Sequence, residues 1–212
     1  MWQTLQEELG PYGLTIIAVA IDNDVEALRE WTATAPGLIY AVDREYVVAE
    51  RYGIVNVPAT VWIDESGRIV RPADTAMGDD RFREFAHVDS SVHHAHLRKW
   101  VIDNERDVDD AAVAELMERP SPELQQARLH RRIAVLLHDR GDVEGAREHL
   151  AEAVALAPHD WVIRRGSMPM NDVDPFGPEF FAFVGEWAAA GSPGYRLGTG
   201  REQPKGPEYW NQ

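Results

Sequence analysis

Four of the chain's eight histidines fall in one short segment, HVDSSVHHAH, at residues 87–96. His93 and His96 are three residues apart, so on a helix they share one face, where two imidazoles can ligate zinc or copper. The segment lacks the HExxH spacing, and no nearby carboxylate stands at a suitable helical offset. The same residues therefore also fit a polar linker between domains or the start of a helix. Below about pH 6.5 such a patch gains charge.

Thiol chemistry is excluded because the chain contains no cysteine. Disulfides, thiolate catalysis and cysteine-ligated metals are ruled out in this polypeptide. The sequence also lacks a Gly-x-Ser-x-Gly elbow and a paired-carboxylate motif. Its GYRLGTG segment has neither the Lys-Ser/Thr step nor the following helix of a phosphate-binding loop. The sequence therefore assigns no catalytic residue and no cofactor.

The elements that would position these residues alternate between helices and strands in the first half. A helix ends at Gly10, and the apolar, β-branched run at 14–21 predicts a strand buried on both faces of a parallel sheet. We expect a helix at 25–35, a strand at 37–42 and a helix at 43–53 capped by Asp43. Residues 59–63 and 68–72 predict a hairpin around Asp64–Gly67. The order indicates an α/β layer with parallel and antiparallel parts.

From Met1 to about Val70, this order resembles the TlpA/ResA-like branch of the thioredoxin fold. The resemblance rests on LTIIAVAID and on AVDREYVVAERYGIVNVPATVWIDESGRIV. It implies an N-terminally incomplete thioredoxin-like domain over residues 1–87, with 79–86 as its last helix. It also implies that Val57 and Pro58 stand at the cis-proline step, where the exposed backbone binds an extended substrate. The alternative is a trans proline that opens a strand.

The sequence departs from this family where the redox group should be. The family's Cys-x-x-Cys pair directly precedes the helix that here ends at Gly10, and a central strand precedes the pair. Without that strand, the segments at 14–21 and 59–63 have unpaired backbone groups, which are costly to bury. Three explanations compete. A longer product carries the pair, or a selenocysteine, upstream; the two flanking strands pair directly; or a second copy donates a strand.

The second half is predicted to be helical, with an extension at 88–165, a connector and docking helix at 166–190 and an irregular Gly/Pro-rich tail at 191–212. Residues 122–158 resemble one tetratricopeptide repeat, with Ile133, Ala134 and Leu137 facing a second helix that carries Ala146, Leu150 and Ala153. One repeat forms no groove, so a helical pair packed on the sheet domain or a dimer surface is favoured over a peptide-binding array.

Four aromatic residues in the segment EFFAFVGEWAAA cover more than one face of the predicted docking helix. They are Phe180, Phe181, Phe183 and Trp187. We expect most of them to be buried. The alternative is an exposed aromatic patch that binds a partner.

Charge narrows the function classes. The net charge of -15 disfavours nucleic acid and anionic membranes as partners. The apolar run at 14–21 is too short to cross a bilayer, and residues 1–12 show no signal peptide, so the cytoplasm is the default location.

The sequence supports two hypotheses for the function of the protein. One is a redoxin that reduces disulfides or peroxides in a longer form. The other is a non-catalytic module whose helical extension binds a protein partner or a second copy.

Overall fold

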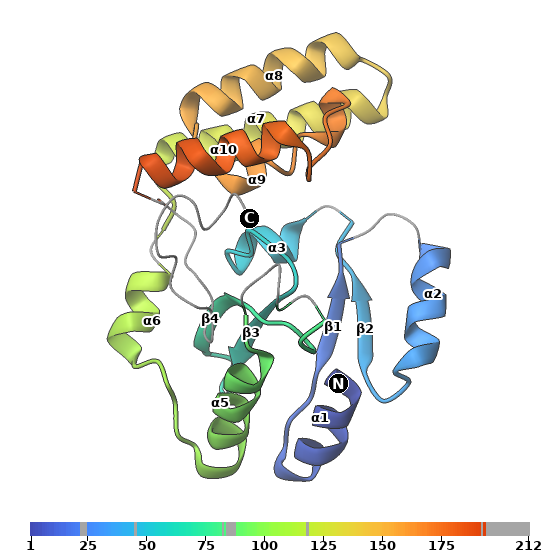
Figure 1. The fold of residues 1–212 in the computed structure, drawn as a ribbon, viewed down its shortest axis with the longest axis vertical. Coiled ribbons are helices and arrows are strands. Elements are labelled where there is room, and N and C mark those ends of the chain that lie inside the picture. Colours follow the sequence, from blue (N-terminus) through green and yellow to red (C-terminus); the bar gives the residue numbers. More distant parts are fainter. Residues whose placement is uncertain are drawn as a thin grey trace. The chain divides into compact units, whose positions relative to one another are not determined.

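The computed structural model describes residues 1–21, 25–44, 46–81, 83, 88–117, 119–191 and 193. These residues form two compact units (Figure 1). Unit 1 comprises the described residues up to Met117, and unit 2 comprises those from Arg119 to Pro193. Unit 1 contains helices and strands, whereas the described part of unit 2 contains helices only. The coarse α/β class predicted from the sequence is therefore confirmed.

Unit 1 follows the predicted order of elements. Its elements are α1 (Trp2–Leu9), η1 (Gly10–Tyr12), β1 (Ile17–Ala20), α2 (Val25–Thr34), β2 (Ile39–Val42), α3 (Val47–Arg51), β3 (Ala59–Ile63), β4 (Ile69–Thr75), α5 (Ser90–Asp103) and α6 (Asp110–Leu116). The helix expected at 43–53 begins only at Val47, with Tyr46 at its N-cap, but the Asp43 carboxylate accepts hydrogen bonds from the backbone amides of Val47 and Ala49 in its first turn. Of the predicted last helix at 79–86, residues 82 and 84–86 lie outside the described residues.

The four strands form two separate two-stranded sheets. β1 and β2 are parallel, with Ile17 opposite Ile39. β3 and β4 are antiparallel, with Ala59 opposite Thr75, and two irregularities interrupt their register. The tight turn between β3 and β4 places Gly67 at φ +80°, a backbone conformation that favours glycine. No hydrogen-bonded pairing joins β1 to β3 within the described residues, so the explanation that these two strands pair directly is wrong.

The predicted burial of β1 on both faces is also wrong. Ile17 is 58% exposed and Val19 is 40% exposed, and the large side chains of β2 are exposed as well. Parallel sheets are normally covered on both faces. Among the described residues, β1 and β2 pair only with each other, and large apolar side chains of both strands are exposed. The β-branched pattern predicted the strand correctly, but the covering layer that the pattern implied is not present among the described residues.

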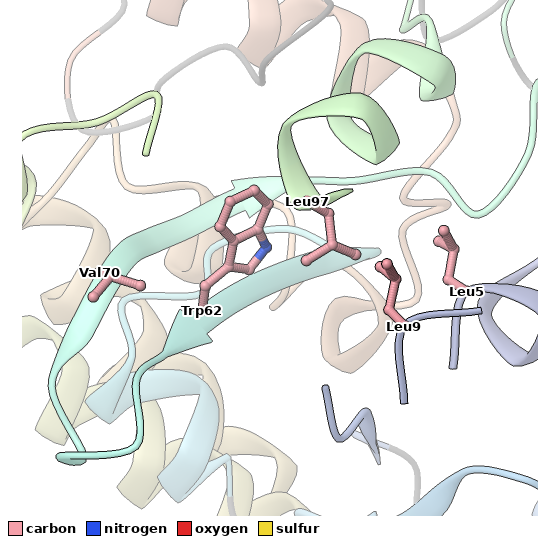
Figure 2. Close-up of a cluster of buried hydrophobic side chains, with 5 residues drawn as sticks. All are labelled: Leu5, Leu9, Trp62, Val70 and Leu97. Atoms are coloured by element: carbon pink, nitrogen blue, oxygen red, sulfur yellow. The ribbon is translucent and has the colours of Figure 1, made fainter. Parts of the chain in front are cut away.

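The core of unit 1 lies between α1, α5 and the β3–β4 sheet (Figure 2). Its buried members are Leu5, Leu9, Trp62, Val70 and Leu97. Leu14 and Ile16, which lead into β1, pack against the same cluster. At the rim, the guanidinium of Arg98 on α5 donates two hydrogen bonds to the carboxylate of Glu8 on α1, at 2.7 and 2.8 Å. The core therefore joins the start of β1 to β3 through side chains.

The division between the units does not coincide with the boundary expected at residue 87. Helix α5 belongs to unit 1 because Leu97 is part of its core and Arg98 bonds to α1. Helix α6 belongs to unit 1 as well, where it packs against β4.

Unit 2 is built on an antiparallel helical hairpin. Its elements are α7 (Pro122–Asp139), α8 (Val143–Leu156), α9 (Trp161–Arg164), η2 (Pro169–Asn171) and α10 (Pro178–Ala189). Ser121 caps α7 through the backbone amide of Leu124, and Gly141 turns the chain at φ +84°. Small buried residues on both helices allow close approach. These are Ala127, Ala134, Ala146 and Ala153. Leu150 is buried beside them as expected, whereas Ile133 is 40% exposed, because it lies outside the stripe that faces α8.

Helix α10 packs against α9 through aromatic rings. Trp161 makes edge-to-face contacts with Phe180, Phe183 and Trp187, at ring-centroid distances of 5.8, 5.3 and 5.2 Å. These four side chains are buried, and Phe181 is exposed. The prediction that most aromatic residues of this helix are buried is therefore confirmed. None of the helices described is both long enough and apolar enough to cross a membrane.

Candidate functional site

Val57 and Pro58 lie directly before β3, on the surface of unit 1. The peptide bond between them is cis, as the resemblance led us to expect. Both residues are exposed, and the carbonyl oxygen of Pro58 accepts a hydrogen bond from the backbone amide of Ala76 at 3.1 Å. The backbone of Pro58 is therefore hydrogen-bonded to the residue that follows β4, while the side chains of Val57 and Pro58 face solvent.

The opposite edge of β3 has no strand partner among the described residues. Pro58 and Asp64 direct backbone groups toward β4, where they bond to Ala76 and Arg68. Backbone groups alternate in direction along a strand, so those of Ala59, Val61 and Ile63 point to the other edge.

β1 has an equivalent open edge. The carbonyl oxygens of Ile16 and Ala20 accept hydrogen bonds from β2, at 3.2 and 2.8 Å. By the same alternation, the backbone groups of Ile17 and Val19 point away from β2. We call these two rows of backbone groups, on β1 and on β3, the two open edges. Both sheets belong to unit 1 (Figure 1), and no hydrogen-bonded pairing joins them in the described part of the chain.

His93 lies behind β3 and is fully buried. Its Nε2 atom is 3.2 Å from the hydroxyl of Thr60, and its ring contacts Trp2 and Trp62 edge-on. Its Nδ1 atom has no hydrogen-bond partner in the described part of the chain. Burial, with a further contribution from the nearby Arg71 guanidinium, lowers the pKa of His93 to about 3. The imidazole is therefore neutral near neutral pH.

His96 lies on the same helix but belongs to a different network. Its Nδ1 atom is 2.9 Å from the carboxylate of Asp107, which is 3.2 Å from the guanidinium of Arg71. The two candidate metal ligands therefore have separate partners, since His93 contacts Thr60 and His96 contacts Asp107. The segment is the start of a helix, as one alternative proposed, with Asp89 as its cap. His87 lies outside the described residues.

Sequence reasoning missed a buried ionic cluster centred on Arg71 of β4. Arg71 is 4% exposed, and its guanidinium lies 2.7 Å from Asp74 and 3.2 Å from Asp107. The guanidinium also lies 5.0 Å from the ring centroid of Trp62. The only signal in the sequence was a charged residue inside an apolar strand pattern, RIVRPADT. The cluster joins β4 to the segment before α6.

The pKa of His93 predicts a specific pH dependence of stability. The unfolded state has the higher pKa, near 6.5, so it binds the proton first as the pH falls. The stabilisation of the folded state that depends on neutral His93 is complete above pH 6.5 and is lost progressively as the pH falls toward 3. We expect the free energy of unfolding to be about 2 kcal/mol lower at pH 5 than at pH 7.5 from this group alone.

Urea unfolding of His93→Gln at both pH values tests this expectation. The difference between the two pH values should shrink by most of that amount, whatever the absolute stability of the variant. His96→Gln is the matched control on the same helix and should retain the difference. An unchanged pH difference in His93→Gln would contradict a buried neutral His93.

The groups of this site that could take part in binding or chemistry are the backbone amides and carbonyls of β1 and β3 and the buried imidazole of His93. Among the described residues, no group of three or more His, Cys, Asp or Glu side chains is arranged to hold a metal ion. A comparison with protein-family models, curated proteins and solved structures found no match to this chain.

Proposed function

We propose that unit 1 is the strand-accepting part of a thioredoxin-like oxidoreductase of the TlpA/ResA type. In this proposal a further strand adds between the two open edges and carries a thiol or a selenol next to Val57 and Pro58. The chain itself contains no cysteine, so the redox group must come with that strand. The complete protein reduces disulfides or peroxides.

The observation that carries the proposal is the exposed apolar strand β1 beside its open edge. A two-stranded sheet is marginal by itself, and a parallel pair is normally buried. Ile17 and Val19 combine large exposed side chains with backbone groups that face no strand among the described residues. One inserted strand would form hydrogen bonds with the backbone groups of both β1 and β3. It would thereby join the two two-stranded sheets into one sheet of five strands.

The proposed role of Val57 and Pro58 is to bind the substrate backbone. Val57 is 51% exposed and is separated from the accepting strand β3 by Pro58 alone. In the proposal its backbone groups pair with an extended peptide in the manner of strand addition. The reacting disulfide of the substrate would then lie beside the redox group of the inserted strand.

Hydrogen exchange of the native protein tests the proposal. The 212-residue chain and the product isolated from its natural source are compared by amide exchange and by intact mass. We expect the native product to exceed the 23.9 kDa of the present chain, to contain a thiol or selenol, and to protect the amides of Ile17, Val19 and Val61. These amides should exchange rapidly in the 212-residue chain.

The amide of Asp43 is the internal control, because it bonds to Ala20 and should be protected in both forms. Native disulfide reductase activity should be lost on alkylation. A native mass of 23.9 kDa with rapid exchange at the three amides would overturn the redoxin proposal. That result would favour the second candidate, a binding module without redox chemistry, which the lack of cysteine supports.

A further inference from the structure

Two histidines face each other across the helical hairpin of unit 2. The Nδ1 atoms of His130 on α7 and His149 on α8 are 2.9 Å apart, and their ring centroids are 5.1 Å apart. Both side chains are half-buried. A single N–H···N hydrogen bond accounts for this distance when one ring donates and the other accepts.

The helical framework holds the two rings at equivalent positions. His130 lies three residues after buried Ala127 and four before buried Ala134. His149 has the same relation to buried Ala146 and Ala153. These small residues set a close approach of the two helices, so the backbones that carry the imidazoles are fixed before any ligand arrives. Such preorganisation favours a chelating site.

A divalent transition-metal ion can replace the shared proton. Imidazole nitrogen binds zinc at about 2.0–2.1 Å, which for a tetrahedral ion requires the two nitrogens to lie roughly 3.3 Å apart. The observed pair needs to open by only a few tenths of an ångström. Imidazole ligands suit zinc, copper and nickel, and copper(II) binds most tightly in this series. No third carboxylate or histidine joins the pair in the described residues, so water completes the coordination.

We propose that His130 and His149 bind one divalent transition-metal ion through their Nδ1 atoms and that the ion links α7 to α8. This proposal is independent of the redox function of unit 1. Its ligand class is zinc or copper(II), with two protein ligands and open positions for water.

Titration of the metal-free full chain with zinc chloride or copper(II) sulfate tests the site. We expect one ion per chain and a higher thermal midpoint of unit 2 with zinc. His130→Ala and His149→Ala should each weaken binding at least tenfold. His138→Ala is the matched control on α7, since this exposed ring lies on the same helix and outside the pair, and it should bind as the parent does.

A measurement on the unmodified chain keeps the test independent of variant folding. The imidazole ¹⁵N resonances of His130 and His149 should change together on addition of zinc, ahead of those of the other histidines. If zinc first shifts other histidines, or if His130→Ala/His149→Ala binds as the parent does, the pair is only a hydrogen bond and the proposal fails.

Discussion

Replacement of Arg71 by methionine is expected to lower the free energy of unfolding of unit 1 by about 3 kcal/mol. Arg71 is 4% exposed and is the cation between the carboxylates of Asp74 and Asp107. Its removal takes the guanidinium away from two largely buried carboxylates, of which Asp107 keeps its contact with His96. Loss of a partner from a buried ion pair costs about 3–5 kcal/mol, and the partial exposure of both carboxylates places the effect at the lower end.

Urea unfolding followed by tryptophan fluorescence measures this change, since Arg71 also lies over the ring of Trp62. Arg68→Met is the matched control, because Arg68 pairs with Asp64 on the exposed turn and such pairs contribute little. Neutralising both carboxylates in the Arg71→Met background, as Asp74→Asn and Asp107→Asn, should recover part of the stability. A small effect of Arg71→Met, similar to that of the control, would show that the ionic cluster is not structural.

The second large effect is expected from Trp187→Ala, which should destabilise unit 2 by about 3–5 kcal/mol. Trp187 is almost fully buried, lies 5.2 Å from Trp161 between ring centroids, and donates its indole N–H to the carbonyl of Pro193 at 2.9 Å. Its truncation leaves a cavity where α10 packs against α9, and the remaining aromatic residues of the helix cannot fill it.

Hydrogen exchange and thermal unfolding by circular dichroism measure this second effect. Amides of α10 should lose protection before those of the α7–α8 hairpin. Phe181→Ala on the same helix is the control, because this ring is exposed and its removal creates no cavity. Equal losses for the two variants would mean that α10 is not held by its buried aromatic face.

Local sequence signals predicted much of the fold because they act over a few residues. Asp43 and Ser121 satisfy the first amides of α3 and α7, and Gly67 and Gly141 provide left-handed turns. The strand at 59–63 was predicted with its observed bounds. The small residues Ala134, Ala146 and Ala153 of the helical hairpin indicate close helix packing from the sequence alone.

Features that depend on distant neighbours were not predictable in the same way. The apolar pattern of 14–21 fixes a strand, but its burial depends on a strand or helix from elsewhere. The sequence around His93 indicates a polar cluster, whereas the ring is buried against Trp2 and Trp62 from other elements. The distance between His130 and His149 likewise depends on the hairpin register, which no short motif in the sequence specifies.

The uncovered β-branched strand has a consequence for the colloidal behaviour of the protein. Proteins with exposed edge strands tend to associate through those edges. Electrostatic repulsion between molecules of like charge opposes this association. Here the repulsion comes from the net charge of -15. Acidification toward the isoelectric point, near 4.9, removes it. Precipitation in mildly acidic buffers, relieved by lower protein concentration, is therefore a direct consequence of how β1 is exposed.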